Sequence, residues 1–251
     1  EDEFRDCLDL AKYCLGTVGL LDKCTFRFSQ WDPANPKNKY EGTKEQWDHA
    51  QSVMAKILDD LGVKYDIGID EAAFYGPKLD IQYKNVYGKE DTLVTIQIDM
   101  LLAERFGMYY TDENGEKKLP YIIHRTSLGC YERTLAYLIE HYAGALPTWM
   151  APEQVRFLPV TDRAVDYCKE QAAKLTAQGY RVTVDTRSEK IGKKIRDAQM
   201  EKIPYMLVVG DRDIEAGTVS PRHRADGDLG AMTLDAFTAV LKDVVDNKLQ
   251  K

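Results

Sequence analysis

The chain has 251 residues, of which 44% are hydrophobic and 30% charged, a composition typical of a globular protein with one large or two ordinary domains. No apolar run approaches the ~20 residues that a membrane-spanning helix needs. The net charge of −7 argues weakly against a nucleic-acid partner. The charge is uneven, however: residues 1–150 carry 17 basic and 25 acidic side chains, whereas residues 151–251 carry 17 and 16. Bases clustered in the second half can still contact phosphate.

The beginning of the chain predicts two helices with a strand between them. Asp6 to Gly16 is expected to form the first helix, and the alternating stretch from Cys24 to Phe28 predicts a strand. Thr43, followed three residues later by Gln46, indicates a capping box. The helix that this box opens is expected to end at Gly62.

From Tyr65 onward the pattern changes to strands. Apolar and polar residues alternate over residues 79–83 and again over residues 93–98, which predicts two long antiparallel strands joined by a turn. Polar side chains stand among the apolar ones in these strands. They are Gln82, Thr95, Gln97 and Asp99.

A second hairpin is expected next. Its turn falls at residues 112–115, between Tyr109-Tyr110 and Tyr121-Ile122. The fold class predicted for this half is therefore α+β, an antiparallel sheet backed by helices.

The stretch from Leu119 to Glu140 is the most informative part of the sequence. A buried strand is predicted at residues 119–123 and a turn at Ser127 to Gly129. An amphipathic helix is predicted after that turn. Gly129 suits a point where the backbone approaches a neighbour or a ligand closely. Arg133 lies off the apolar stripe of this helix, a position that suits binding of a nucleotide triphosphate. A structural arginine at the edge of a core fits this stretch equally well. The predicted stripe consists of Tyr131, Leu135, Leu138, Ile139 and Tyr142.

A second domain is expected after a linker. Two prolines between Gly144 and Pro152 prevent a helix from continuing, so we place the domains at residues 1–146 and 152–251. Beyond the linker, strands alternate with helices, which predicts a small doubly wound α/β domain. The expected strands are residues 155–160, 180–184 and 205–209, with 218–220 at an edge, and the expected helices follow Thr161 and begin near Ile191 and Leu234.

The start of the chain and its cysteines point to a cytoplasmic piece of a longer protein. Glu1-Asp2-Glu3 is unlike a signal peptide and includes no initiating Met. The five cysteines are odd in number and form no Cys-x-x-Cys pair, which argues for reduced thiols. They are Cys7, Cys14, Cys24, Cys130 and Cys168.

Taken alone, each candidate site residue has an ordinary structural explanation. A histidine that follows a buried strand, such as His124, is usually a satisfied core residue. Tyr75 and Lys78 flank Gly76-Pro77, which is compatible with an ordinary turn. The bases between Arg187 and Lys202 are more often a solvated helix face than a nucleic-acid site.

The motifs taken together resemble one family. Gly129-x-x-x-Arg133 at the start of a helix is similar to motif 3 of the class II aminoacyl-tRNA synthetases. With His124-Arg125, Tyr75-Gly76-Pro77-Lys78 and Thr95-x-Gln97-x-Asp99, the sequence resembles the bacterial-type threonyl-tRNA synthetases over nearly its whole length. The resemblance implies the C-terminal part of an enzyme that activates threonine with ATP and Mg²⁺ and transfers it to tRNA-Thr.

The resemblance also implies roles for single residues in the first half. Tyr75, Lys78, Gln97 and Arg133 would be catalytic. Arg133 would pair with the triphosphate and stabilise charge as pyrophosphate leaves. The residues that would contact ATP or the adenylate are Thr95, Gln97, Cys130 and Arg133, although Cys130 stands where some relatives have serine.

His124 would be one of three protein ligands of a zinc ion that binds the amino and hydroxyl groups of threonine. A site built to bind a hydroxyl rejects an analogue that lacks it by ~10⁴ or more, which would exclude valine. The other two ligands, a cysteine and a histidine, do not occur at matching positions here. We therefore expect an incomplete site that holds zinc weakly.

For the second half, the resemblance is to the anticodon-binding domain that several class II synthetases share. Four residues fall where the threonine enzymes read anticodon bases, namely Ser188, Lys202, Asp213 and Arg222. Only Arg222 matches the family's usual residue directly. Motifs 1 and 2 do not occur in this sequence, so we expect the parent to be a homodimer and these residues alone to be inactive.

Two other functions stay open at this point. A catalytically dead paralogue would use the chain to bind RNA or a partner, but retention of the site residues argues against it. A prolyl- or histidyl-type synthetase would share the second domain, but His124 and the Tyr-Gly-Pro-Lys turn argue against that alternative.

Overall fold

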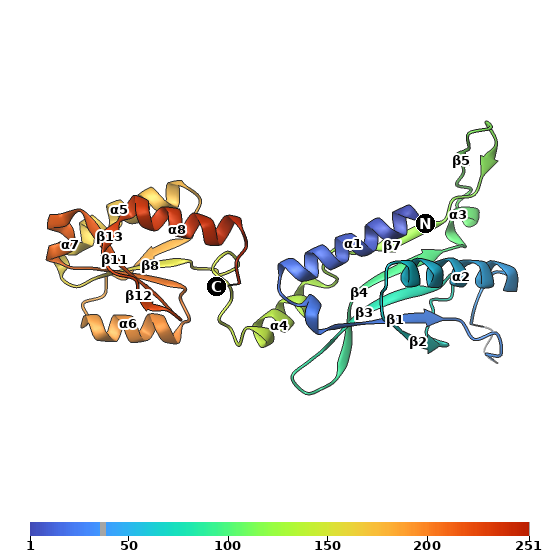
Figure 1. Ribbon diagram of the computed structural model, residues 1–251, viewed down its shortest axis with the longest axis horizontal. Coiled ribbons are helices and arrows are strands. Elements are labelled where there is room, and N and C mark those ends of the chain that lie inside the picture. Colours follow the sequence, from blue (N-terminus) through green and yellow to red (C-terminus); the bar gives the residue numbers. More distant parts are fainter. Residues whose placement is uncertain (36–38, 251) are drawn as a thin grey trace. The chain divides into compact units, whose positions relative to one another are not determined.

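The structure is a computed structural model that describes residues 1–35 and 39–250. The chain divides into two compact units, Glu1–Glu140 and His141–Lys251 (Figure 1). Within the described part, none of the helices combines the length and the apolar character needed to cross a membrane.

The first unit is built on a five-stranded sheet in the order β2-β1-β3-β4-β7. The parallel pair is β1 with β2, and the remaining pairs are antiparallel. The two long strands expected near residues 79–83 and 93–98 are present as β3 and β4. The strands are β1 (Cys24–Gln30), β2 (Asp66–Ile69), β3 (Lys78–Lys84), β4 (Glu90–Asp99) and β7 (Ile122–Arg125).

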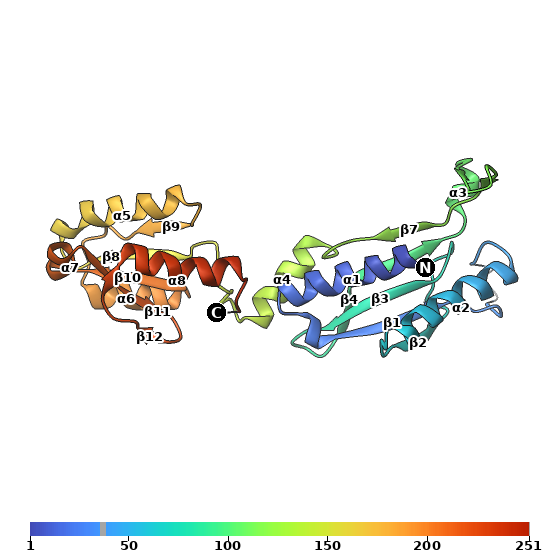
Figure 2. The same ribbon diagram turned by 45° about the horizontal axis from the view of Figure 1, so that its top comes forward.

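Helices α1 (Asp2–Thr17) and α2 (Lys44–Asp60) back this sheet (Figure 2). The capping box is confirmed, because the Gln46 amide donates to Thr43 Oγ1 and the Thr43 amide donates to Gln46 Oε1. Phe4 of α1, Ile57 of α2 and Ile98 of β4 border one apolar hollow, so the even-numbered apolar face of β4 is turned to the helices. The odd-numbered polar residues of β4 consequently lie on the opposite face. A short 3₁₀ turn, η1 (Leu21–Lys23), joins α1 to β1.

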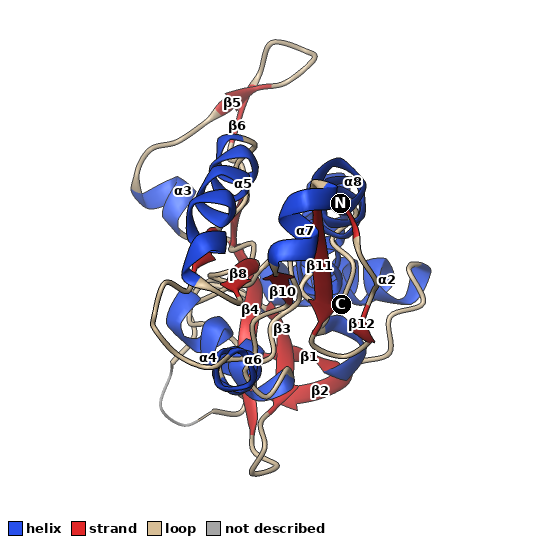
Figure 3. Cartoon of the chain, turned by 90° about the vertical axis from the view of Figure 1, so that its left-hand side faces the viewer, coloured by secondary structure: helices blue, strands red, loops and turns tan. Residues whose placement is uncertain are grey.

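The second hairpin and the strand after it differ from expectation. The turn at residues 112–115 is present, but its arms, β5 (Tyr110–Thr111) and β6 (Lys117–Lys118), form a separate sheet that follows α3 (Leu102–Arg105) (Figure 3). Ile122 is not part of this hairpin, because it begins β7 and pairs with Asp99. The expected buried strand from residue 119 is also wrong. Leu119 is 58% exposed, and β7 is an edge strand of the described sheet whose isoleucines are half-buried.

The predicted apolar stripe is only partly buried in α4 (Tyr131–His141), in which Leu138 is buried as expected. Tyr131, Leu135 and Ile139 are exposed by 74%, 52% and 49%. The buried side carries Tyr137, whose hydroxyl donates to Asp91 Oδ2 at 2.6 Å and whose ring packs 5.0 Å from that of Tyr83. The buried side of α4 therefore combines Leu138 of the predicted stripe with Tyr137, which lies outside it.

The second unit holds a mixed sheet in the order β12-β11-β10-β8-β9, with β13 paired to β11. Strands β8, β10 and β9 are parallel, and β11 and β12 continue the sheet in antiparallel sense. Residues 218–220 belong to β11, which has neighbours on both sides and is not the edge strand that we expected. The strands are β8 (Val155–Pro159), β9 (Val182–Val184), β10 (Tyr205–Val209), β11 (Thr218–His223), β12 (Gly227–Asp228) and β13 (Met232–Thr233).

Helices cover both faces of this second sheet (Figures 1 and 2). One face packs Cys168 and Leu175 of α5 and Phe237 and Leu241 of α8 into the larger core, and the other packs Ala198 of α6 into a smaller one. The predicted fold class, an α+β sheet unit followed by a small α/β domain, is thus confirmed, with a mixed second sheet. The helical elements are η2 (Asp162–Ala164), α5 (Val165–Ala177), α6 (Ile191–Met200), α7 (Asp211–Ala216) and α8 (Leu234–Asp246).

Candidate functional site

Strand register brings predicted site residues into one row across the first sheet. Lys78 of β3 is paired with Gln97 of β4, and Gln97 is paired with His124 of β7. Directly paired residues of neighbouring strands point to the same side of a sheet. These three side chains therefore share the polar face, opposite α1 and α2.

An open pocket of about 360 Å³ lies on this face. Gln97, His124 and Arg133 come from β4, β7 and α4, and all three line it. The sequence predicted that an imidazole, a guanidinium and a glutamine far apart in the chain converge on one wall, and the structure brings them together. The remaining lining residues are Thr92, Leu93, Thr95, Arg125 and Thr126.

His124 is held by a fully buried carboxylate. Its Nε2 lies 2.9 Å from Asp99 Oδ2, and the backbone amides of Leu101 and Leu102 donate to Asp99 Oδ1, each at 2.9 Å. Burial raises the pKa of Asp99, but the hydrogen bonds from His124 and from the two amides outweigh it and hold that pKa below its usual value.

Tyr75 covers the imidazole from one side. Its ring centroid is 5.6 Å from that of His124, and its hydroxyl donates to Gln97 Oε1. Burial, and then the negative charge of Asp99, raises the pKa of Tyr75, so the phenol stays protonated and able to donate. Because Tyr75 donates to the Gln97 carbonyl and so fixes the orientation of the side chain, the Gln97 NH₂ group is placed to donate to a ligand.

Gly76 explains how Tyr75 reaches the sheet. A Cβ at Gly76 would lie 1.8 Å from the carbonyl oxygen of Ile98, so only glycine allows the loop to cross β4 this closely. The backbone bonds from Met100 N to Tyr75 O (3.1 Å) and from Ile98 N to Pro77 O (3.0 Å) fasten the crossing.

Lys78 is turned toward the buried carboxylate of Asp80, which also contacts Thr95 of the pocket. Its ammonium pairs with Asp80 Oδ2, and Asp80 also accepts hydrogen bonds from Ser29 Oγ and Thr95 Oγ1, both at 2.8 Å. Lys78 is not among the residues that line the pocket. Sequence reasoning missed Ser29 and Asp80 as parts of the site. The available signal was a carboxylate set between Leu79 and Ile81, two residues after Lys78.

Gly129 brings α4 up against β4. Its φ is +72°, and a Cβ there would lie 1.7 Å from the Leu93 carbonyl oxygen, which confirms the close approach predicted for this glycine. Arg133 then donates from Nη1 to the Thr92 carbonyl at 2.7 Å. Cys130 is exposed, its thiol donates to Glu132 Oε2 at 3.2 Å, and it does not line the pocket.

The residues present do not fit a zinc site by themselves. Across residues 1–35 and 39–250, no group of three or more His, Cys, Asp or Glu side chains could hold a metal ion. Asp99, the acid next to His124, already accepts three hydrogen bonds. Cys24 is half-buried, and burial raises the pKa of its thiol to about 11, which disfavours the thiolate that zinc needs.

The four anticodon candidates are placed separately in the second unit. Ser188 is exposed before the start of α6 and Lys202 follows its end, so a ten-residue helix, about 15 Å long, separates them. The ammonium of Lys202 donates to the Ala143 carbonyl. Asp213 accepts from the Gly210 amide and from the hydroxyls of Ser220 and Thr218, and Arg222 pairs with Asp228 at 3.3 Å.

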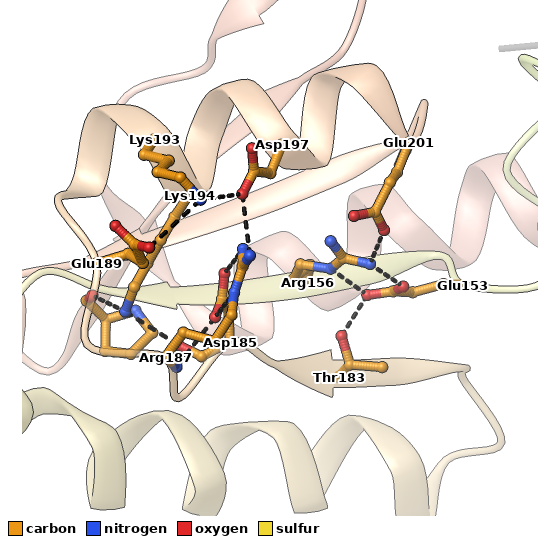
Figure 4. Close-up of polar contacts among 11 residues, drawn as sticks. Glu153, Arg156, Thr183, Asp185, Arg187, Glu189, Lys193, Lys194, Asp197 and Glu201 are labelled. Atoms are coloured by element: carbon orange, nitrogen blue, oxygen red, sulfur yellow. Dashed lines mark hydrogen bonds and ion pairs between the residues drawn. The ribbon is translucent and has the colours of Figure 1, made fainter.

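The basic run from Arg187 to Lys202 is largely engaged with acids and carbonyls (Figure 4). Arg187 pairs with Asp185 at 2.7 Å and with Asp197 at 3.0 Å. Lys194 is only 4% exposed and donates to the Pro159 and Asp185 carbonyls, both at 3.1 Å, which ties the ends of β8 and β9 together. Much of this cluster therefore stabilises the domain and is not a free cationic surface.

Comparisons with known proteins agree with this architecture. Residues 1–142 match the model of the tRNA synthetase class II core domain (G, H, P, S and T), and residues 154–244 match the anticodon binding domain. A threonine–tRNA ligase of Clostridium perfringens is 57% identical over 237 residues, which are 94% of this chain and 37% of that protein. One from Clostridium botulinum is 52% identical over 248 residues, 99% of this chain and 38% of that protein.

Solved structures show the same similarity. The crystal structure of the RNA binding domain of threonyl-tRNA synthetase from Cryptosporidium parvum superposes with a TM-score of 0.86 at 31% identity, over 96% of this chain and 59% of that one. A putative threonyl-tRNA synthetase from Aeropyrum pernix superposes with a TM-score of 0.77 at 26% identity, over 98% of this chain and 60% of that one. The chain thus spans little more than a third of the length of the curated relatives. It belongs to the class II aminoacyl-tRNA synthetases, and within them it corresponds to the C-terminal portion of the threonyl enzymes, a part of the catalytic core followed by the anticodon-binding domain.

Proposed function

We propose that the chain is the part of a threonine–tRNA ligase that forms one wall of the threonyl-adenylate site and reads the anticodon of tRNA-Thr. The parent enzyme activates threonine with ATP and Mg²⁺ and transfers it to the tRNA, as a homodimer in the cytoplasm. The observation that carries this proposal is the meeting of Gln97, His124 and Arg133 in one pocket on the polar face of the sheet.

The polar groups of the pocket suit an adenylate and its precursors. The Gln97 NH₂ group supplies two donors, and Tyr75 fixes its orientation by donating to the Gln97 carbonyl. Arg133 supplies a guanidinium, whose Nη1 donates to the Thr92 carbonyl. Such donors bind carboxylate and phosphate oxygens and stabilise the negative charge that grows as pyrophosphate leaves. Thr95 borders the same pocket, and Lys78 and Tyr75 act beside it.

Residues 1–146 would supply this catalytic wall, and residues 152–251 would bind the anticodon loop. Arg222 would carry the strongest base contact, with Ser188, Lys202 and Asp213 supporting it, by the modes usual for unstacked RNA bases. Because the chain covers 37% of its relatives' length, we propose that these 251 residues do not aminoacylate by themselves. We assign no zinc-dependent step to them, since His124 is the one matching ligand.

Catalysis is tested by threonine-dependent ATP–pyrophosphate exchange at high concentration of the 251-residue chain. We expect no exchange, because one wall does not enclose both substrates and exclude water from them. Clear threonine-dependent exchange would refute the proposed inactivity of these residues alone.

The pocket is tested by calorimetric titration with a non-hydrolysable threonyl-adenylate analogue. Gln97→Ala and Arg133→Ala should each weaken binding at least ~10-fold, since a hydrogen bond to a charged group contributes about 1.5–3 kcal/mol. Arg105→Ala, which removes an exposed arginine outside the pocket, is the matched control and should change nothing. Equal affinities for wild type and both pocket variants would remove the basis for the proposed site.

RNA binding is tested by titrating the chain with a tRNA-Thr transcript and with the same transcript carrying a different anticodon. We expect tighter binding of the first, and loss of that preference in Arg222→Ala. Arg163→Ala, which removes an arginine that is 78% exposed, serves as the control for a general loss of positive charge. A chain that binds both transcripts alike would favour the alternative of a general RNA-binding paralogue.

A further inference from the structure

The hairpin that follows α3 has no core of its own. In residues 106–121, which we call the projecting hairpin, all residues except Asp112 and Pro120 are exposed, and the strands stand apart from the five-stranded sheet (Figures 1 and 3). Lys118 is paired with Tyr110 and shares its face, whereas Lys117, on the opposite face, lies 3.9 Å from the centre of the Tyr109 ring. Each face of the hairpin therefore presents a tyrosine to solvent.

The projecting hairpin exposes six large apolar side chains. Their exposed fractions range from 43% for Met108 to 73% for Phe106. Apolar groups gathered on a surface in this way mark a site of interaction, and a hairpin of two strands is marginally stable at best alone in water. The hairpin therefore needs a surface to pack against. The six side chains are Phe106, Met108, Tyr109, Tyr110, Leu119 and Tyr121.

The turn of the projecting hairpin is nevertheless well fixed. Asp112 Oδ1 accepts the amides of Asn114 and Glu116, each at 2.9 Å, and Asp112 Oδ2 pairs with Lys118. The Asp112 amide also donates to the Glu116 carbonyl at 2.9 Å. The hairpin is thus preorganised for a partner, since little backbone freedom remains to be lost on binding.

Charge favours a second copy of the chain over RNA as that partner. Residues 106–121 carry three acidic and two basic side chains, so the projecting hairpin has no surplus of positive charge to attract phosphate. Among the described residues, Glu113 and Glu116 at its turn pair with no cation. The same hairpin running in the opposite direction would bring Lys117 and Lys118 of a second copy toward these glutamates.

The exposed apolar area also suits a small dimer. Half-exposed side chains of this size offer roughly 100 Å² each, so the six together offer roughly 600 Å². A standard interface buries about 800 Å² from each partner, and the open edges of β5 and β6 would add backbone area to the apolar part.

We propose that the projecting hairpin is a self-association surface, which packs against the same hairpin of a second copy of the chain. The contact is isologous, because the same patch serves both copies. The proposal rests on the proposed function only in giving a surface to the homodimer expected of the parent. It involves no residue of the pocket.

The first test follows the 251-residue chain by sedimentation velocity from ~1 to ~300 µM, since interfaces of this size differ widely in affinity. We expect a 28.6 kDa monomer at the lowest concentration and a reversible dimer as the concentration rises. Tyr109→Ser combined with Tyr110→Ser should raise the dissociation constant of the dimer at least ~10-fold, because tyrosines are among the side chains that contribute most to interfaces. Tyr87→Ser, which changes a residue that is 89% exposed in the turn between β3 and β4, is the matched control and should leave the dimer unchanged.

The second test identifies the contact and needs no variant. Unlabelled and ¹⁵N-labelled chains are mixed and treated with a carbodiimide, which joins lysine to carboxylate groups that touch. We expect cross-links from Lys117 or Lys118 to Glu113 or Glu116 in peptide pairs that combine both labels. Pairs that carry only one label come from within a single chain, and finding these alone would contradict an interface at the hairpin.

A wild-type chain that stays monomeric over the whole range would overturn the proposal, as would a folded double variant that dimerises like the wild type. A monomer whose affinity for the tRNA-Thr transcript falls in the double variant would assign the hairpin to RNA instead. The tests of adenylate binding and pyrophosphate exchange involve no residue of the projecting hairpin. Failure of the dimer therefore leaves the proposed function untouched, and failure of those tests leaves the dimer result standing.

Discussion

Replacing Gly129 by alanine should damage the first unit far more than a glycine-to-alanine change at an ordinary turn. Gly129 combines a left-handed backbone, with φ of +72°, with direct contact against β4, where a Cβ would lie 1.7 Å from the Leu93 carbonyl oxygen. Gly88, in the turn between β3 and β4, has φ of +80° and nothing within 4 Å of the added Cβ. The two substitutions therefore share the strain but not the clash.

The expected magnitudes follow from these two terms. A non-glycine residue in the left-handed region costs roughly 1–2 kcal/mol, which is the whole effect for Gly88→Ala. At Gly129 the backbone of β4 or of the turn must also move, and forcing extra atoms into a packed region adds roughly 1–3 kcal/mol. We expect Gly129→Ala to lower the free energy of unfolding by roughly 2–5 kcal/mol and to shift Arg133, which lies one helical turn further on.

The assay is urea unfolding followed by tryptophan fluorescence, in which Trp31 and Trp47 report on the first unit. Each midpoint and slope gives a free energy, and the difference between Gly129→Ala and Gly88→Ala isolates the clash. Equal losses for the two variants would refute the argument that Gly129 is required by its contact with β4.

Three other predictions concern pH, thiols and a helix. Hydrogen bonds from Arg187 and its positive charge hold the pKa of Asp185 below its usual value. The stability that ionised Asp185 contributes is therefore fully present above its pKa in the unfolded chain and is lost as the pH falls through its lower pKa in the folded chain. Asp185→Asn should make the free energy of unfolding depend less on pH in the acid range. Burial raises the pKa of the Cys168 thiol to about 12, whereas Cys130 is exposed. A thiol reagent should therefore label Cys130 quickly and Cys168 only after unfolding. Fast labelling of Cys168 in the folded protein would contradict its burial. Gly192 is the second residue of α6 and has open space around it, so Gly192→Ala should raise the thermal midpoint, and a lower midpoint would show a contact that the structure lacks.

Local patterns predicted much of the fold because their causes are local. The capping box of Thr43 and Gln46 and the alternation in β3 and β4 depend on residues close together in sequence, and each appears as expected. The turn at residues 112–115 was also correct. The arms of that hairpin were not, because pairing of Ile122 with Asp99 is a long-range choice that the local alternation cannot express.

The candidate site could be predicted as residue types but not as a network. Gln97, His124 and Arg133 came from motifs, and the structure brings them to one pocket. The acids that hold Lys78 and His124, Asp80 and Asp99, could not be assigned these partners from one sequence, since an acid in a strand is ordinarily turned to water. Their burial and their partners emerge only when three strands are aligned.

The sequence by itself determined the capping box at Thr43, the alternation of β3 and β4, and which family the chain resembles, because capping, alternation and motif spacing are properties of neighbouring residues. Only the tertiary structure decided which side of α4 is buried, that β11 is internal, and that one nitrogen of His124 is committed to Asp99. These depend on contacts between segments distant in the chain, such as the hydrogen bond from Tyr137 to Asp91, which local sequence patterns do not express.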